Sequence, residues 1–279
     1  MIDQLRSEAY PINALCEALG VSRSGYYAYL KRSNKDANAE ELISYIYHQY
    51  KGVLGVRGIE SRLRQDYCWD INHKKVHRIM KKLGLTAVIR RKNHKKKYHQ
   101  SPTGRVYHNL LNRDFEARKP FEKLVTDITE FKAGNQTIYL SVIMDLFNNE
   151  IIAHQASQEH DIKLVENTMK KAFKKKGTHT DTILHSDQGM QYRSNRYHQL
   201  TKTYNLTPSM SRKGTCLDNA CAEGFFSHFK SEAFILFPFQ SVQSAYRSIS
   251  KYIAYYNKQR YQKRLHRLSP SQYLQWMAA

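Results

Sequence analysis

Cysteine is scarce in this chain, with four scattered residues among 279. Because no cysteine pair stands at ligand spacing, the sequence predicts neither a disulfide scaffold nor a zinc site, and we expect reduced thiols in a bacterial-type cytosol. The opening residues MIDQ lack the basic start and apolar run of a signal peptide. No stretch approaches the roughly 20 consecutive apolar residues of a membrane span. These absences argue against secreted and membrane-spanning classes of protein.

Acidic residues are also few, with 24 Asp and Glu against 45 Lys and Arg, which gives a formal net charge of +21. Such an excess repels itself in a compact fold and usually indicates a polyanionic partner. Nucleic acid is the leading candidate, while a ribosome-associated or membrane-surface protein remains an alternative. Apolar residues make up 41% of the chain, enough for a real core. The length predicts two or three domains.

The first 89 residues carry two helix-turn-helix patterns. Residues 1–37 form a small helical unit, in which a break at Gly20 and a cap at Ser22 separate two short helices. Residues 38–89 predict three further helices and a second, more basic helix-turn-helix-type unit. Its last helix sets basic side chains around an apolar stripe, and we expect DNA contacts from Lys74, Lys75 and Arg78. An ordinary helical hairpin and a solvated basic face are the respective alternatives.

Residues 90–120 are predicted to be a basic linker between domains. Its first ten positions are almost entirely basic, a composition that repels itself and stays extended without a partner. Such a segment can lie along the phosphates of a nucleic acid. We therefore expect DNA contacts from Arg90, Arg91, Lys95, Lys96 and Lys97.

From residue 121 the periodicity changes to that of an α/β domain. Three strand patterns over 123–131, 137–147 and 151–157 are joined by turn signals. Helices, one of them predicted over 192–204, then alternate with short strands up to residue 237. This order predicts a ribonuclease H-like core over 121–237, with a mixed five-stranded sheet and helices on both faces. Residues 238–279 predict a helical tail.

Three acids on separate elements of this core are candidate metal ligands. Asp127 lies within a strand pattern, Asp187 directly follows a strand, and Glu223 lies near the start of a helix. Alone, each could be an ordinary surface or turn residue. Together, three carboxylates can hold two Mg²⁺ ions, or Mn²⁺, for phosphodiester chemistry. Lys230 lies on the same helix face as Glu223, and Arg212 with Lys213 precedes that helix, so these cations are predicted to contact DNA.

The motifs around these acids resemble those of one family. They are T-D-I-T around Asp127, H-S-D-Q-G-x-Q-Y around Asp187 and S-x-S-R-K-G-x-x-x-D-N-A-x-x-E-x-F-F around Glu223. Thirty-five residues separate the last two acids, and the tail adds Y-N-x-x-R and L-S-P-x-x-Y. From about residue 40 to 273, the chain resembles the larger-frame (OrfB-type) transposases of bacterial insertion sequences, within the retroviral-integrase superfamily.

The resemblance implies a DNA transposase that acts at the bacterial nucleoid. It implies metal-dependent cleavage at the element's ends, then attack by the freed 3′-OH on target DNA without a covalent enzyme intermediate. Asp127, Asp187 and Glu223 would be the catalytic and metal-binding triad, with Lys230 as a DNA contact. It also implies a homo-oligomer on DNA and an upstream-frame partner with a helix-turn-helix and coiled coil. A ribonuclease H-like nuclease that never joins strands and a non-catalytic DNA-binding regulator are the alternatives.

Overall fold

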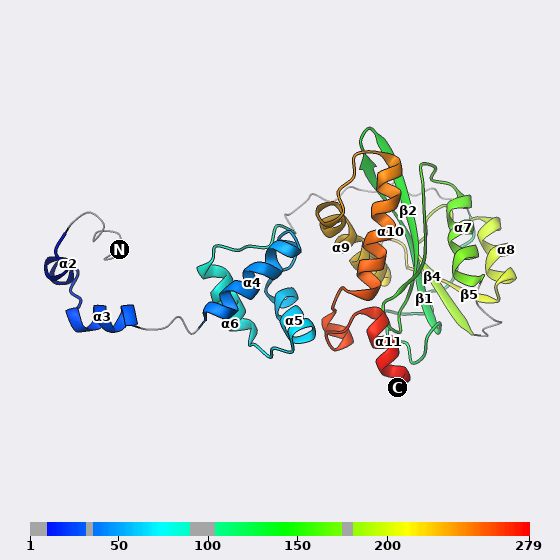
Figure 1. Cartoon of the computed structure of the whole chain (residues 1–279). Coiled ribbons are helices and arrows are strands. Elements are labelled where there is room, and N and C mark those ends of the chain that lie inside the picture. Colours follow the sequence, from blue (N-terminus) through cyan, green and yellow to red (C-terminus); the bar gives the residue numbers. More distant parts are fainter. Residues whose placement is uncertain (1–9, 32–35, 90–103, 175–180) are drawn as a thin grey trace.

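The computed structural model describes residues 10–31, 36–89, 104–174 and 181–279, shown in Figure 1. The basic positions Arg90, Arg91, Lys95, Lys96 and Lys97 lie outside these residues. Among the described residues, no helix is both long and apolar enough to cross a bilayer.

Two short helices open the described chain. Helix α2 (Ile12–Ala18) and helix α3 (Arg23–Lys31) are joined by a turn at Gly20, whose φ of +62° is one that glycine tolerates well. Ser22 Oγ accepts a hydrogen bond of 3.0 Å from the Gly25 amide, as the predicted cap requires.

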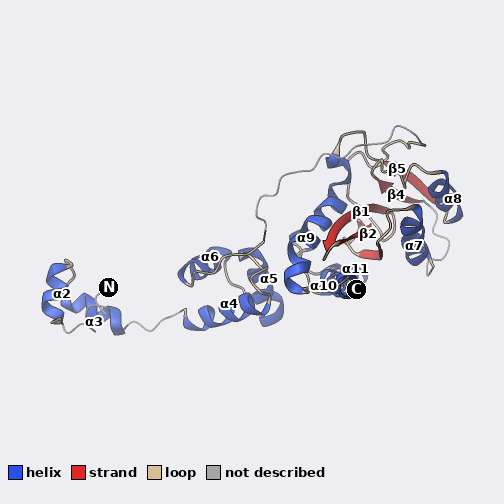
Figure 2. Cartoon of the chain, turned by 90° about the horizontal axis from the view of Figure 1, so that it is seen from above, coloured by secondary structure: helices blue, strands red, loops and turns tan. Residues whose placement is uncertain are grey.

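The next three helices form a unit with its own core. Helices α4 (Ala37–Gln49), α5 (Val56–Tyr67) and α6 (His73–Lys82) pack together through aliphatic side chains that include Ile43, Ile46, Ile59, Leu63, Val76 and Ile79. Asn72 caps α6 by accepting from the Lys74 amide at 2.8 Å. This helical unit, drawn in Figures 1 and 2, is the helix-turn-helix-like region that the sequence predicts.

The larger unit is built on a five-stranded mixed sheet. Its strands are β1 (Lys123–Ala133), β2 (Gln136–Asp145), β3 (Ile151–Ser157), β4 (Thr182–Ser186) and β5 (Leu206–Met210). The first three are antiparallel, β4 is parallel to β1 and β5 is parallel to β4, in the order β3-β2-β1-β4-β5. The predicted ribonuclease H-like α/β class is confirmed.

Helices cover both faces of this sheet because neighbouring side chains of each strand point to opposite sides. Leu124 packs with α7 (Ile162–Phe173) and α8 (Asn195–Thr203), whereas Val125 packs with α9 (Ala220–Leu236) and α10 (Val242–Lys258). Figure 2 shows the two helical layers flanking the sheet. The predicted start of α8 at Tyr192 is wrong. Residues 189–194 form a turn instead, and Ser194 caps the helix by accepting from the Tyr197 amide.

The C-terminal segment attaches to the sheet through polar side chains. Asn257, at the end of α10, bonds both the amide and the carbonyl of Ile151 on β3. Ser269 begins α11 (Pro270–Ala278) with a capping box. The helix-turn-helix-like unit contacts this segment, since Arg62 on α5 donates to the carbonyl of Gln259 and stacks between the rings of Tyr50 and Tyr261.

Candidate active site

Asp127 and Asp187 lie level with each other on neighbouring parallel strands. The register pairs Val125 on β1 with His185 on β4, and each aspartate follows two residues later. The two strands run in the same direction, so both acids lie at the same level of the sheet, Asp127 within β1 and Asp187 just after β4. This is the carboxyl end of β4, where ligands bind in open α/β sheets.

Glu223 approaches this end of β4 from the first turn of α9. Helix α9 packs against β1, and the side-chain amide of Asn219 lies 3.5 Å from the carbonyl oxygen of Thr126. Burial raises the pKa of Asp127 well above its usual range, and the charges on Asp187 and Glu223 raise it further. Asp187 and Glu223 are therefore both close enough to Asp127 to act on its charge.

Lys230 lies two turns beyond Glu223 on α9, and its positive charge opposes the negative charge of the acids. Its ammonium group favours the ionised form of Asp127, and in return Asp127 and Glu130 partly counter the lowering of the Lys230 pKa by burial. The residue as a whole remains exposed. A cation that is both exposed and adjacent to the acids can meet a phosphate at this site.

Tyr192 is a neighbour of the acids that the sequence did not single out. The ring is buried, and its hydroxyl lies 3.3 Å from Thr126 Oγ1. Burial raises the pKa of Tyr192 well above its usual range, and the charges of Asp127 and Asp187 add to the shift. The tyrosine therefore stays neutral beside the carboxylates. The motif Q-G-x-Q-Y, which contains Tyr192, was visible in the sequence. Its position was not, because the turn at 189–194 is what brings Tyr192 under the site.

The donor set suits a hard divalent cation, although its side chains are not arranged around one. No three His, Cys, Asp or Glu side chains in the described part of the chain lie close enough, as they stand, to hold a metal ion. Asp127 Oδ1 accepts instead from the Ile128 amide at 2.7 Å, and Asp187 Oδ1 from the Gly189 amide at 2.8 Å. Three partly repelling carboxylates offer the all-oxygen ligands that Mg²⁺ and Mn²⁺ prefer. The residues fit such an ion by chemistry.

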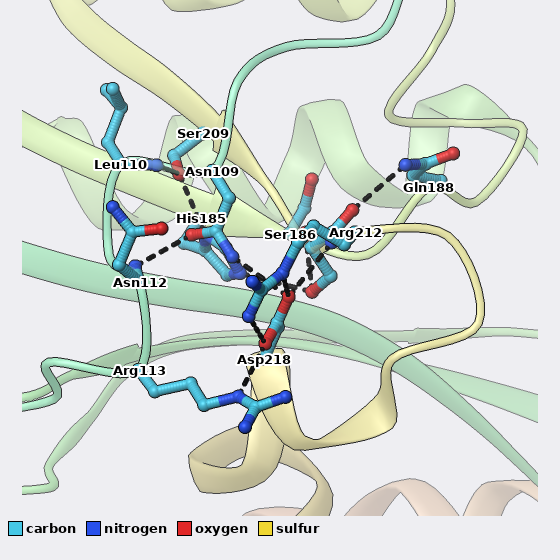
Figure 3. A network of polar contacts seen from close by, with 11 residues as sticks. Asn109, Leu110, Asn112, Arg113, His185, Ser186, Gln188, Ser209, Arg212 and Asp218 are labelled. Carbon is cyan, nitrogen blue, oxygen red and sulfur yellow. Dashed lines mark hydrogen bonds and ion pairs between the residues drawn. The ribbon is translucent and has the colours of Figure 1, made fainter.

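A buried polar network that was not predicted from the sequence lies next to the site (Figure 3). His185, fully buried on β4, shares hydrogen bonds with Ser209 Oγ at 2.8 Å and Ser211 Oγ at 3.1 Å. Burial lowers the pKa of His185 to about 4, so the imidazole is neutral at pH 7. Asp218, also fully buried, accepts from Arg212 and Arg113. The only sign of this network in the sequence was the repetition of polar residues in the motif between positions 209 and 219.

The other predicted DNA contacts differ in their surroundings. Lys74 and Lys213 are exposed. Lys75 and Arg78 form ion pairs with Asp36, at 2.8 and 2.5 Å, and their hydrogen bonds lower the Asp36 pKa to about 2. Arg212 is paired with Asp218 but keeps 55% of its side chain exposed. Three of the predicted cations thus already have acidic partners.

Comparison with known proteins identifies the parts of the chain. Two integrase core domain families match residues 117–216 and 223–276, and an HTH-like domain family matches residues 33–93. InsK of Escherichia coli, assigned as the transposase of insertion sequence element IS150, is 40% identical over 98% of this chain and 96% of its own length.

Two further similarities involve a second transposase and a solved structure. The transposase InsF for insertion sequence IS3A, also from Escherichia coli, is 31% identical over 80% of this chain and 79% of its own length. The HTLV-2 integrase catalytic core domain, solved in complex with magnesium, shares 13% identity and a TM-score of 0.44 over 56% of this chain and 97% of its own. The match to InsK spans nearly the whole of both proteins, so the chain belongs to the insertion-sequence transposases that carry an integrase core domain.

Proposed function

We propose that this chain cuts DNA at the ends of an insertion sequence and joins the freed 3′-OH to target DNA. The proposal rests chiefly on one observation: the register of β1 with β4 brings Asp127 level with Asp187, and Glu223 lies in the first turn of α9, which packs against β1. Clustered carboxylates at a sheet edge are costly unless a cation offsets them. In this proposal Asp127, Asp187 and Glu223 hold divalent ions, Mg²⁺ or Mn²⁺.

The chemistry is a pair of phosphoryl transfers. In the first, water attacks a phosphodiester, the bond from phosphorus to the 3′ oxygen breaks, and a 3′-OH is released. In the second, that hydroxyl attacks a target phosphodiester, so one P–O bond forms as another breaks. Two bound ions would assist by activating the attacking oxygen and stabilising the leaving one. The second step conserves the number of phosphodiester bonds and needs no energy-rich co-reactant.

The protein's own residues position the DNA. Lys230, beside Asp127, would bind a phosphate next to the reacting one, and exposed Lys213 would contact the strand from the loop before α9. Phosphate contacts of this kind orient the duplex without reading its sequence. The ends would be recognised by the helix-turn-helix-like unit, with the basic residues Arg90, Arg91, Lys95, Lys96 and Lys97 following the backbone between the two units.

Helix α6 is the proposed reading helix, and its two basic faces are not equivalent. Lys75, Arg78 and Lys82 lie one turn apart and face Asp36 and Glu40, with which they form ion pairs. Lys74, His77 and Lys81 form the adjacent stripe and are exposed. We therefore assign the main DNA contacts of α6 to the second stripe. The enzyme would act as a homo-oligomer on DNA at the bacterial nucleoid, alone or with an upstream-frame partner.

A strand-transfer assay tests the proposal. Purified chain is incubated with Mg²⁺, labelled ends of its own element and a supercoiled plasmid, beside the Glu223→Gln variant. Joined products from the unmodified chain alone would support it. Nicked ends that are never joined would favour the ribonuclease H-like nuclease, while full activity of Asp187→Asn in every assay would favour the non-catalytic regulator. If neither protein reacts, the fused upstream-frame product is assayed in the same way.

A further inference from the structure

Two arginines from distant parts of the chain converge on one buried carboxylate. Asp218 Oδ1 accepts from Arg113 Nε and from an Arg212 terminal nitrogen, both at 2.9 Å, and Oδ2 accepts from Arg212 Nε at 2.8 Å. The Arg212 amide and the Asn109 side chain also donate to Oδ2, at 3.1 and 2.9 Å. Figure 3 shows Asp218 between the two guanidinium groups.

The Asp218 carboxylate has enough hydrogen-bond donors without Arg113. Arg212 already binds it bidentately, with further donors from a backbone amide and from Asn109. Arg113 contributes through Nε only, and its two terminal amino groups bond no other described residue. The side chains of Arg113 and Arg212 are 47% and 55% exposed. Two guanidiniums on one carboxylate leave a net charge of +1 that faces solvent.

The backbone that presents Arg113 is in an unfavourable conformation. Asn112 and Arg113 have φ values of +47° and +66°, so two consecutive residues other than glycine adopt the left-handed region. The Asn112 amide donates to Asn109 Oδ1 at 2.9 Å, which holds the turn in place. Strained residues of this kind often mark functional positions.

This junction is attached to the elements that carry all three acids. Gln188, the neighbour of Asp187, donates to the carbonyl of Ser211, which precedes Arg212. Asn219, which follows Asp218, donates to the carbonyl of Thr126, the neighbour of Asp127. Glu223 lies little more than one helical turn beyond Asp218. The pair of arginines is therefore held at a defined position relative to the active site.

We propose that Arg113 and Arg212, held together by Asp218, bind a backbone phosphate of a DNA strand that enters or leaves the active site. The inference rests on the proposed function and adds a second anchor to the one at Lys230. Guanidinium groups suit this role because their planar donors match phosphate oxygens. Asp218 acts as a positioning residue, since it sets the separation of the two cations and offsets their repulsion.

The test measures DNA binding without catalysis. All proteins carry Glu223→Gln, no metal is added, and end duplexes are titrated in which one phosphate at a time is replaced by a neutral methylphosphonate. With Arg113 present, one replacement near the scissile phosphate should weaken binding about tenfold. In Arg113→Gln the same replacement should cost much less, because only Arg212 still faces that phosphate, and the slope of log affinity against log salt should fall by about 1.

Two further variants separate binding from folding. Arg113→Gly removes the same side chain and relieves the left-handed strain, so it should show the same DNA defect without a lower melting temperature. Arg247→Gln, which removes an exposed cation from α10, should keep the tenfold effect. The inference would be overturned if every methylphosphonate weakened DNA binding by Arg113→Gln and Arg113→Gly as much as it weakens binding by the protein with Arg113. The proposed function would still stand. If the chain alone binds no element ends, the same titrations are made with the fused upstream-frame product, and no binding by that product with Arg113 present would overturn both.

Discussion

The buried ion pair between Glu232 on α9 and Arg260, which follows α10, makes a quantitative prediction. Glu232 is 3% exposed and accepts from Arg260 at 2.8 and 2.9 Å and from the Tyr252 hydroxyl at 3.0 Å. Burial alone would raise the Glu232 pKa, but hydrogen bonds from His228 and Arg260 reverse this and lower it from 4.5 to about 2. At ~1.4 kcal/mol per pKa unit, the charge of Glu232 stabilises the fold by about 3 kcal/mol at pH 7.

Glu232→Gln should therefore lower the free energy of unfolding by about 3 kcal/mol at pH 7, within the range for breaking a buried pair. The folded pKa is depressed, so this stabilisation is complete above pH 4.5 and is lost as the pH falls towards 2. Urea unfolding at pH 7 and pH 3 should show the difference between the two proteins shrinking to less than half at pH 3. A difference that is equal at both values would show that the Glu232 charge is not its source.

Asp127→Ala, Asp187→Ala and Glu223→Ala should each abolish cleavage yet keep end binding in a gel-shift assay, and near-normal cleavage by one of them would remove that residue from the triad. Lys74→Ala and Lys81→Ala should each reduce the salt slope of DNA binding by about 1, whereas Lys75→Ala, whose charge is offset by Asp36, should change it less. Asn257→Ala should destabilise the fold by about 2 kcal/mol in thermal unfolding because two hydrogen bonds to Ile151 are lost, and an unchanged melting temperature would contradict this.

The sequence predicted the fold well because its periodicity and caps agree with one another. Ser22 caps the helix that the sequence assigns to it, and alternate residues of β1 separate into two cores. The start of α8 was misplaced because Tyr192 and Tyr197 continue a helical pattern. The turn at 189–194, which brings Tyr192 to the acids, depends on tertiary contacts.

For similar reasons, the sequence predicted some residues of the site but not the contacts of others. Motif spacing pointed to three acids, and the register of β1 with β4 brings two of them level. The ion pairs of Lys75 and Arg78 with Asp36 could not be foreseen, since they join residues about 40 positions apart. Asp218 was part of a motif but gave no sign that it would be fully buried between two arginines from separate segments.

The central claim is that Asp127, Asp187 and Glu223 hold the ions that drive strand transfer. Metal-dependent rescue of Asp187→Cys tests it most directly, because a thiolate binds Mn²⁺ much better than Mg²⁺. We predict that this variant joins no ends with Mg²⁺ and regains joining with Mn²⁺, while the unmodified chain uses both ions. Joining by Asp187→Cys at the unmodified rate in Mg²⁺ would contradict the account, because the carboxylate at this position would then not be a ligand.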